Sequence, residues 1–555
     1  MGSEPNTDAI ARELIDRYWN QLLETEPILG TAVGDERFDD RLPDPGPEGR
    51  AARERLHAGA LEEVGLLDRE ELGDDLRISI DILEAIAQRD LASLEHRIDR
   101  LWAASHLWGP AGLVGDLASL QRVDTPERVE RFVARISATP HFYDAATELL
   151  REGIADAVTA PRIVVERAIG QTERILEAGA EDSPLLAQVA AEDTAAREAI
   201  VKQTERDLLP ALSSYLDGLR AYLPSATETI GLSALPNGEA MYASQILSWT
   251  TLPLDPRATH ELGLDDLAKI QDERARSAQL LGSPDPASAT AALDASGENA
   301  FASKEELKAS AEEQVRRSWE AAPAWFGRIP SANCEVRLVE EFREQDMPFA
   351  FYNQPTEDGS RPGVYYVNGY GLSGKPKHHL ASTTYHEANP GHHFQIALEQ
   401  QMEGNTTLRR FGGFLAGSAF TEGWGLYSER LADEMGLYLD EAERLGMLDL
   451  QGMRAARLVV DTGIHALGWS RDRAIRTMEE AGVPNVDAVI ETDRYITMPG
   501  QALSYKVGQF EIERQRAAAA EREGASFSLS AFHDRLLSLG SLPLAALRRE
   551  LGRSA

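Results

Sequence analysis

The chain has 555 residues, with 91 Asp and Glu against 56 Lys and Arg, and a formal net charge of −35. Such an acidic balance repels phosphates, so it argues against binding to nucleic acid and against docking on an anionic membrane. Hydrophobic residues make up 43% of the chain, which is enough for a large core and argues against extended disorder.

The sequence also predicts a compartment. Its one cysteine, Cys334, cannot form an intramolecular disulfide. The first residues lack the basic and apolar regions of a signal peptide, and no apolar run reaches the ~18 residues of a membrane-spanning helix. We therefore expect no membrane partner and a cytoplasmic location.

Helical periodicity dominates the first part of the chain. The first helix is predicted by apolar residues at spacings of three and four, with Thr7 or Asp8 placed to cap it: Ala11, Leu14, Ile15, Tyr18 and Leu22. Similar patterns predict helices within 50–110, 126–152, 160–225, 256–280 and 302–323. Stretches rich in Pro and Gly predict breaks at 42–48, 223–237 and 282–297.

The composition and periodicity of the sequence change at about residue 330. The stretches VRLVEEF, FAFYNQ and GVYYVNGY, with the turn-like TEDGSRPG before the last, predict a small sheet of two or three strands. Helical periodicity resumes at about 376 and continues to the end. We therefore expect a mostly α fold with a helical N-terminal lobe, 1–330, and a lobe with the sheet and further helices, 331–555. Nothing marks a flexible linker, so the lobes form one unit with a cleft between them.

A cluster of histidines follows the predicted sheet. Five of the twelve histidines lie between His378 and His393, around the run YHEANPGHHFQ. A His-Glu pair followed by another His is typical of zinc-peptidase helices, in which His at i and i+4 bind the metal and the Glu is the general base. The alternative is a group of capping or surface histidines in a loop.

The spacing of this cluster requires a broken helix. On an ideal helix His392 lies about 240° around the axis from His386, and His393 lies about 10.5 Å further along it. Pro390 removes the N–H that would bond the carbonyl of His386, and Gly391 tolerates a looped-out turn. With two residues looped out, His392 takes the place of i+4, and His393 stays an alternative ligand.

Three further segments offer polar side chains to such a site. A two-histidine zinc site usually adds a carboxylate, and the predicted helix AFTEGWGLYSER carries Glu422 and Glu429 two turns apart. Arg457, Asp461 and His465 step by four, so that Asp461 would fix the tautomer of His465. In the third segment, Tyr505 lies one turn after Gln501 and would donate a hydrogen bond to an oxyanion. The plain alternatives are solvated helix charges, a buried salt-bridge row and a packed tyrosine.

Four motifs together resemble one family. YHEANPGHHFQ, TEGWGLYSERL, RLVVDTGIHALGW and PGQALSYKVGQ look like the motifs of the DUF885 family of bacterial proteins. The resemblance implies a two-lobed, zincin-like helical fold similar to zinc carboxypeptidases, oligopeptidases and angiotensin-converting enzyme. It favours Glu422 as the ligand through its Glu-Gly-Trp position, and His392 over His393.

The glycine loop 369–374 formally matches a dinucleotide fingerprint, but no βαβ unit follows it. We instead expect this loop beside the metal, with Tyr365, Tyr366 and Asn368 on a strand edge. In the enzymes that the fold resembles, such an edge pairs with extended peptide.

The sequence therefore predicts a hydrolase with one Zn²⁺ per chain that cleaves peptide or related amide bonds. The predicted ligands are His386, His392 and Glu422, with Glu387 as general base and Tyr505 and His465 at the oxyanion. Substrate contacts are assigned to Tyr366, Asn368, Arg457 and Gln501, and positioning of the ligands to Glu429, Asp461 and His393. The alternatives are a metalloenzyme for an ester, lactone or modified amino acid, and a non-catalytic peptide-binding protein.

Overall fold

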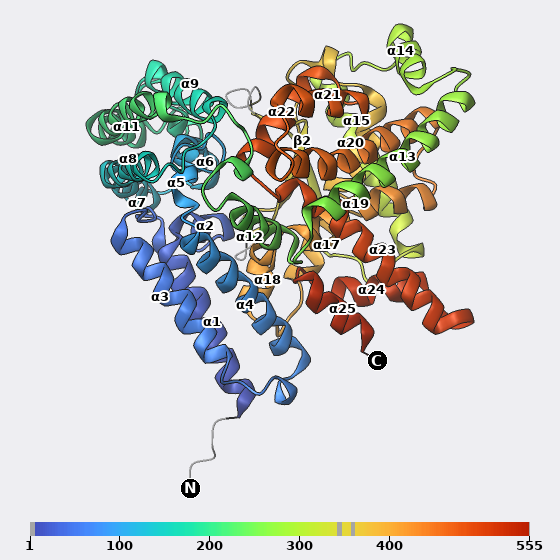
Figure 1. The fold of residues 1–555 in the computed structure, drawn as a ribbon, viewed down its shortest axis with the longest axis horizontal. Coiled ribbons are helices and arrows are strands. Elements are labelled where there is room, and N and C mark those ends of the chain that lie inside the picture. The colour runs from blue at the N-terminus through green and yellow to red at the C-terminus, as the bar shows by residue number, and fades with distance from the viewer. Residues whose placement is uncertain (1–5, 341–343, 345–346, 357–360, 554–555) are drawn as a thin grey trace.

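The computed structural model describes residues 6–340, 344, 347–356 and 361–553 and is mostly α-helical with one small sheet (Figure 1). The first group of helices, on the left of Figure 1, comprises α1 (Thr7–Thr25), α2 (Pro27–Val33), α3 (Pro47–Val64), α4 (Asp74–Glu95), α5 (Asp99–Trp102), α6 (Leu113–Leu120), α7 (Pro126–Ser137), α8 (Thr139–Ala155), α9 (Arg162–Ala178), α10 (Thr194–Gln203) and α11 (Leu209–Tyr222).

The second group begins with α12 (Gly238–Thr250), α13 (Pro256–Leu280), α14 (Pro286–Ser296) and α15 (Lys304–Ala321), followed by the strands β1 (Cys334–Leu338), β2 (Ala350–Asn353) and β3 (Gly363–Val367). The later helices are α16 (Leu380–Glu387), α17 (His392–Gln400), α18 (Thr407–Gly412), α19 (Ala419–Glu434), α20 (Glu441–His465), α21 (Arg471–Glu480), α22 (Asn485–Thr497), α23 (Ser504–Glu523), α24 (Leu529–Ser538) and α25 (Leu544–Gly552).

Most of the predicted helices are present. The apolar stripe of α1 is buried as expected, but the cap is Asn6, whose side chain accepts from the N–H of Asp8, rather than Thr7 or Asp8. The predicted break at 282–297 is only partly present, because α13 ends at Leu280 as expected but α14 forms within this stretch. Asp285 caps that helix through the N–H of Ser288, and Pro286 fits its first turn.

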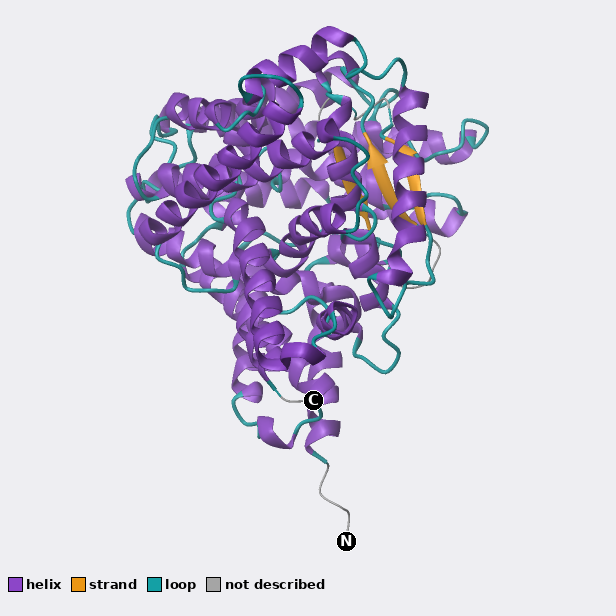
Figure 2. Cartoon of the chain, turned by 90° about the vertical axis from the view of Figure 1, so that its right-hand side faces the viewer, coloured by secondary structure: helices purple, strands orange, loops and turns teal. Residues whose placement is uncertain are grey.

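The sheet has the strand order β1-β3-β2, with β1 parallel and β2 antiparallel to β3. It lies to one side of the molecule, enclosed by helices (Figure 2). All five residues of β3 are buried, and side chains of α15 and α16 share a hydrophobic cluster with the sheet. The small sheet is confirmed, but Tyr366 lies on the central strand, so the prediction of a strand edge there is wrong.

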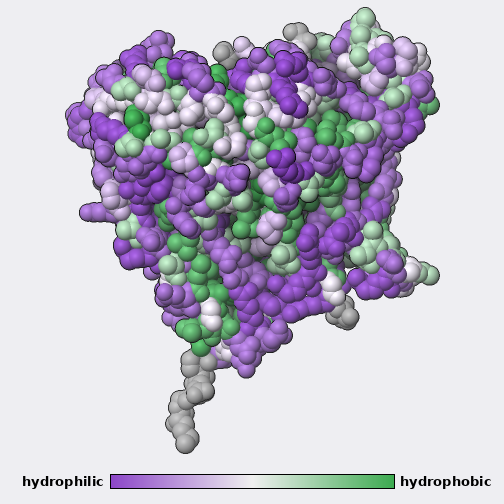
Figure 3. All heavy atoms as spheres, in the orientation of Figure 1, coloured by the Kyte–Doolittle hydropathy of each residue, from purple (hydrophilic) through white to green (hydrophobic). Residues whose placement is uncertain are grey.

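The main hydrophobic core joins distant parts of the sequence. One cluster of buried residues runs from Ala11 in α1 to Leu551 in α25, and a second fills the helices between Ala103 and Ala226. Hydrophobic residues are visible in the middle of the face in Figure 3, with hydrophilic residues around them. The two groups of helices therefore share core residues, and the lobe boundary at residue 330 stays a prediction.

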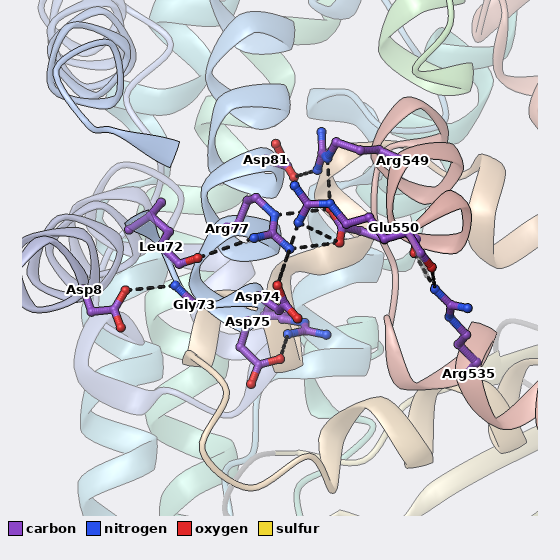
Figure 4. Close-up of polar contacts among 12 residues, drawn as sticks. Asp8, Leu72, Gly73, Asp74, Asp75, Arg77, Asp81, Arg535, Arg549 and Glu550 are labelled. Carbon is purple, nitrogen blue, oxygen red and sulfur yellow. Dashed lines mark hydrogen bonds and ion pairs between the residues drawn. The ribbon is translucent and has the colours of Figure 1, made fainter. Parts of the chain in front are cut away.

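Ion pairs fasten the C-terminal helix to the first group. Arg77 of α4 donates to Glu550 of α25 at 3.0 and 3.3 Å and to Asp74 at 2.5 Å (Figure 4). Arg549 pairs with Asp81 in the same cluster. Because Arg77 and Glu550 are buried and bonded in a fork, removing either partner would leave a buried charge unpaired, so the pair fixes how α25 lies against α4.

A buried carboxyl in α17 predicts a pH-dependent stability. Glu399 accepts from Gln395 at 2.6 Å and from Ser541 at 2.7 Å, and burial raises its pKa from 4.5 to about 7. The folded state therefore holds this proton more tightly than the unfolded state, and stability falls as pH rises from about 4.5 to about 7.

Glu399→Gln is expected to remove this dependence, because the amide stays neutral. Each pKa unit corresponds to about 1.4 kcal/mol, so the gain at pH 8 should be on the order of 1–3 kcal/mol. Thermal melts of both proteins from pH 5 to pH 8 measure it, with the exposed Glu403→Gln as control. Parallel pH profiles for wild type and Glu399→Gln would show that this carboxyl does not set the slope.

Candidate metal centre

The predicted break in the histidine helix is present. α16 ends at Glu387 and α17 begins at His392, with Pro390 and Gly391 in the turn between them. The break brings the rings of His386 and His392 to 4.6 Å between centroids, at 77° to each other. One ligand atom each of His386, Glu387 and His392 lies within 4.8 Å of the others.

Glu422, in the first turn of α19, completes this group. Its Oε2 atom lies 3.5 Å from Nε2 of His386 and 3.5 Å from Nε2 of His392. Donor atoms at 2.0–2.2 Å from a tetrahedral zinc ion lie about 3.3–3.6 Å from one another. The two separations from Glu422 and the N, N, O donor set therefore fit a zinc ion.

The ring of His386 is oriented by a hydrogen bond at Nδ1, the nitrogen that faces away from Glu422. Nδ1 of His386 lies 2.9 Å from Oε1 of the fully buried Glu429, whose Oε2 accepts from Gln451 at 2.8 Å. Lys506 in turn donates to Oε1 of Gln451 at 2.9 Å, which sets the direction of that amide. With its Nδ1–H donated to Glu429, His386 presents the lone pair of Nε2 to the site, as metal-binding histidines do.

The site favours positive charge. Burial lowers the pKa of His386, but the carboxylates of Glu422 and Glu429 outweigh it and raise this pKa to about 9. Burial likewise raises the pKa of Glu422, yet the two imidazoles hold it well below its usual value. Two carboxylates around two buried histidines therefore attract a cation, whether a proton or a metal ion.

Small residues and one tryptophan of α19 let these groups come together. A Cβ atom on Gly425 would lie 2.6 Å from the ring of His386, and one on Gly423 would lie 2.3 Å from Gly508 of α23. The indole N–H of Trp424 donates to the carbonyl of Pro390 at 2.8 Å. The run EGWG thus makes room for the ring of His386, lets α23 pack closely and fastens the turn between the two histidines.

Comparisons with known proteins agree with this fold. Residues 27–551 match the family model described as "Bacterial protein of unknown function (DUF885)". The chain belongs to this family.

Two solved structures share the fold of this DUF885 protein. A putative lipoprotein from Colwellia psychrerythraea matches with a TM-score of 0.91 at 25% identity, covering 98% of both chains. A putative lipoprotein of unknown function from Shewanella oneidensis matches with a TM-score of 0.75 at 18% identity, covering 97% of this chain and 99% of its own. No curated protein matches the sequence.

The described part of this DUF885 protein contains no helix that is both long and apolar enough to cross a bilayer. The cytoplasmic location stays a prediction.

His393 takes no part in the group formed by His386 and His392. Its Nδ1 lies 3.0 Å from the hydroxyl of Tyr352, and its Nε2 lies 3.0 Å from the carbonyl of Ala332. Burial lowers its pKa to about 4, so the ring stays neutral. With both nitrogens bonded elsewhere, His393 joins α17 to β2, and the geometry favours His392 as the second ligand.

The predicted pairing of Asp461 with His465 is wrong. Asp461 accepts from the hydroxyl of Tyr242 at 2.6 Å and from the N–H of Gly500 at 3.1 Å. His465 accepts at Nδ1 from the N–H of Leu232 and donates from Nε2 to the carbonyl of Tyr495. Both nitrogens of His465 are used by backbone groups, so this residue has no hydrogen left for an oxyanion.

Tyr505 lies beside His386. Its ring is nearly parallel to that of His386, at 6.5 Å, and the guanidinium of Arg457 lies 4.2 Å from its centroid. Burial, helped by the charge of Glu422, raises the pKa of Tyr505, so the phenol keeps its proton at neutral pH. Gln501 accepts from Arg494 at 2.6 Å.

Arg457 is itself buried in a polar network. It donates to the hydroxyl of Tyr495 and to Glu491, each at 2.9 Å, while its Nη1 has no hydrogen-bond partner among the described residues. The predicted salt-bridge alternative thus describes part of its contacts, and the substrate contact of Arg457 stays a prediction.

The side chain of Asn368 makes structural hydrogen bonds to the backbone. Its amide donates to the carbonyls of Glu344, Met347 and Pro348 at 2.7–3.2 Å, and it is 1% exposed. The predicted substrate contact is therefore wrong for this residue, because its donors are used to hold the loop before β2. Tyr366 is buried too and stacks on Phe351 at 4.9 Å.

Sequence reasoning missed Gln451 and Lys506. Lys506 directly follows Tyr505 in the motif PGQALSYKVGQ, and this position is the one signal in the sequence that marks it. Gln451 lies 22 residues beyond Glu429 on another helix, and no local pattern marks it.

Glu429→Gln is expected to weaken zinc binding about 10- to 100-fold, because partners that orient a ligand contribute this much to affinity. The amide accepts poorly from His386 and sets an NH₂ group against that of Gln451. Competition with a chromophoric chelator measures the affinity, and Glu434→Gln, an exposed position on the same helix, is the control. Equal affinities in all three proteins would remove this role from Glu429.

Proposed function

We propose that this protein is a zinc-dependent hydrolase of peptide or related amide bonds. The observation that carries the proposal is the position of Oε2 of Glu422, 3.5 Å from Nε2 of His386 and 3.5 Å from Nε2 of His392, with Glu387 directly beside His386. Each separation is that of neighbouring ligands of a tetrahedral zinc ion. A pure binding site has no need for a carboxylate at that position, whereas a hydrolase needs a base there.

The residues divide the chemistry between them. When bound, zinc would polarise the scissile carbonyl and lower the pKa of water toward about 7. Glu387, which is half-buried, takes the proton of the attacking water and passes it to the leaving amine. Tyr505 donates a hydrogen bond to the carbonyl oxygen as negative charge develops there. Arg457, packed on the face of Tyr505, holds the phenol in place.

The proposal includes a two-lobed, zincin-like arrangement. The hydroxyl of Tyr365 on β3 lies 3.1 Å from Oγ1 of Thr384, which ties the sheet to the metal-binding helix α16. In the order β1-β3-β2 an extended substrate finds a strand edge on β2, which contacts α16, and not on β3. We therefore move the peptide-binding edge from Tyr366 and Asn368 to Ala350–Asn353.

The test is the metal content of wild type, His386→Ala and Glu422→Ala by elemental mass spectrometry, followed by a peptide library on the zinc-loaded protein. Bound zinc that both variants lose from this centre, together with peptide cleavage, supports the proposal. Turnover of small esters without peptide cleavage would favour a non-peptide substrate, and tight peptide binding without turnover would favour a binding protein. A wild type that refuses zinc would overturn the proposal.

A further inference from the structure

A second group of metal-type ligands lies outside the centre described above. It consists of His378 and His379, in the turn Lys377–His379 that leads into α16, and Asp449 of α20. Nε2 of His378 lies 3.4 Å and Nε2 of His379 lies 3.3 Å from the same Oδ2 atom of Asp449. These separations repeat those around Glu422 and match neighbouring ligands of a tetrahedral ion, at about 3.3–3.6 Å.

The ring of His378 is oriented in the manner of a metal ligand. Its Nδ1 lies 2.8 Å from Oδ1 of Asn299, an atom that also accepts from the backbone N–H of His378. The amide of Asn299 cannot be reversed, because its NH₂ donates to Asp294 at 2.7 Å. Nδ1 of His378 therefore carries the hydrogen, and in the neutral ring the lone pair of Nε2 faces an oxygen of Asp449.

With His378 neutral, two acceptors face each other at 3.4 Å, longer than the usual 2.7–3.2 Å of an N–H···O hydrogen bond, so the contact calls for either a proton on Nε2 or a cation between the two atoms. A cation between Nε2 of His378 and Oδ2 of Asp449 satisfies both atoms and the ring of His379 at once. The two imidazoles meet at 62°, with centroids 4.4 Å apart, so their lone pairs can converge on one point.

The other carboxylate oxygen of Asp449, Oδ1, is held by Arg274. This atom accepts from Nε and Nη2 of Arg274 at 2.7 and 2.6 Å, which leaves Oδ2 to the histidines. Ligating carboxylates are commonly hydrogen-bonded in this way. The charge of Arg274 also opposes a cation, so binding here should be weaker than at His386, His392 and Glu422.

The two centres are separate but connected. His379 precedes His386 by seven residues, about 10.5 Å along a helix axis. Asp449 precedes by two residues Gln451, which bonds Glu429 behind His386. His378 and Asp449 are buried, while the side chain of His379 is 15% exposed and gives an ion its route from solvent.

We propose that His378, His379 and Asp449 form a second site for a divalent transition-metal ion of the zinc type, which fastens the start of α16 to α20. The N, N, O donor set suits zinc, nickel or cobalt and not calcium or magnesium. This site stands on its own geometry and does not depend on the proposed hydrolase activity.

The experiment is a zinc titration of the full-length protein, without an affinity tag, read by elemental mass spectrometry after equilibrium dialysis. Wild type should bind two ions, and His379→Ala and His386→Ala one each. The double variant should bind none. Asp449→Asn should also lose one ion, and the exposed His141→Gln should still bind two. Circular dichroism identifies any variant that fails to fold, and His379→Ala, at a partly exposed position, keeps the test decisive if Asp449→Asn does not fold.

Two results would overturn the second site: a wild type that binds a single ion lost in His386→Ala, or an unchanged zinc content in folded His379→Ala. A single ion that is lost in His379→Ala and kept in His386→Ala would support the second site and remove the metal from the proposed catalytic one. The two proposals therefore fail in distinguishable ways.

Discussion

Glu387→Gln is expected to lower the turnover of a peptide substrate by about 10²- to 10⁴-fold, the usual contribution of a general base, while zinc content stays at the wild-type level. The amide has the shape of the carboxylate but cannot accept the proton of water. Because Glu387 ends α16 directly after the ligand His386, the substitution leaves the ligand set and the break at Pro390 in place.

Steady-state kinetics on zinc-loaded protein, with metal content measured on the same sample, checks this expectation. Glu434→Gln, exposed near the end of α19, is the matched control and should behave as wild type. Full turnover of Glu387→Gln with zinc bound would show that another group removes the proton, and the assigned mechanism would be wrong.

Tyr505→Phe is expected to lower kcat by about 10²- to 10³-fold with little change in KM, as for the loss of one oxyanion donor. The ring lies beside His386 and under Arg457, so phenylalanine keeps the packing and removes only the hydroxyl. The raised pKa of Tyr505 means that wild type holds this proton throughout the neutral range.

Comparing kcat and KM for wild type, Tyr505→Phe and the exposed Tyr370→Phe separates a role in the transition state from one in substrate binding. A raised KM with unchanged kcat would assign Tyr505 to ground-state binding. Unchanged kcat and KM would show that Tyr505 serves only to pack against Arg457.

The break between His386 and His392 could be predicted because it follows from one residue. Pro390 removes a donor and adds a clash wherever the rest of the chain lies, so the local rule holds in the folded protein. Glu422 could be proposed for a different reason, its Glu-Gly-Trp position in a motif that resembles the family, because α17, α18 and the turn Gly413–Ala416 separate it from His392 in the chain. The helix α14 carried its own start signal in Asp285 and Pro286, which the surrounding Gly, Ser and Ala obscured.

The failures concern partners from distant segments. A spacing of four places Asp461 and His465 on one face of α20. It does not reveal that Asp461 accepts hydrogen bonds from Tyr242 and Gly500 instead of from His465. Strand order is equally hidden, because β3, the last of the three strands in the sequence, lies between β1 and β2 in the sheet. Tyr366 therefore looked like an edge residue although it lies on the central strand.

The hydrogen bond from Trp424 to Pro390 has a consequence for how an ion would bind. One side chain of α19 fastens the turn between His386 and His392, and the same helix carries Glu422 and Glu429, so these donors already have fixed positions in the protein alone. Because the site is preorganised in this way, the chain loses little conformational entropy when the ion binds. Chelation should then remove zinc without unfolding the protein, and the empty protein should reload as fast as the ion can reach the turn.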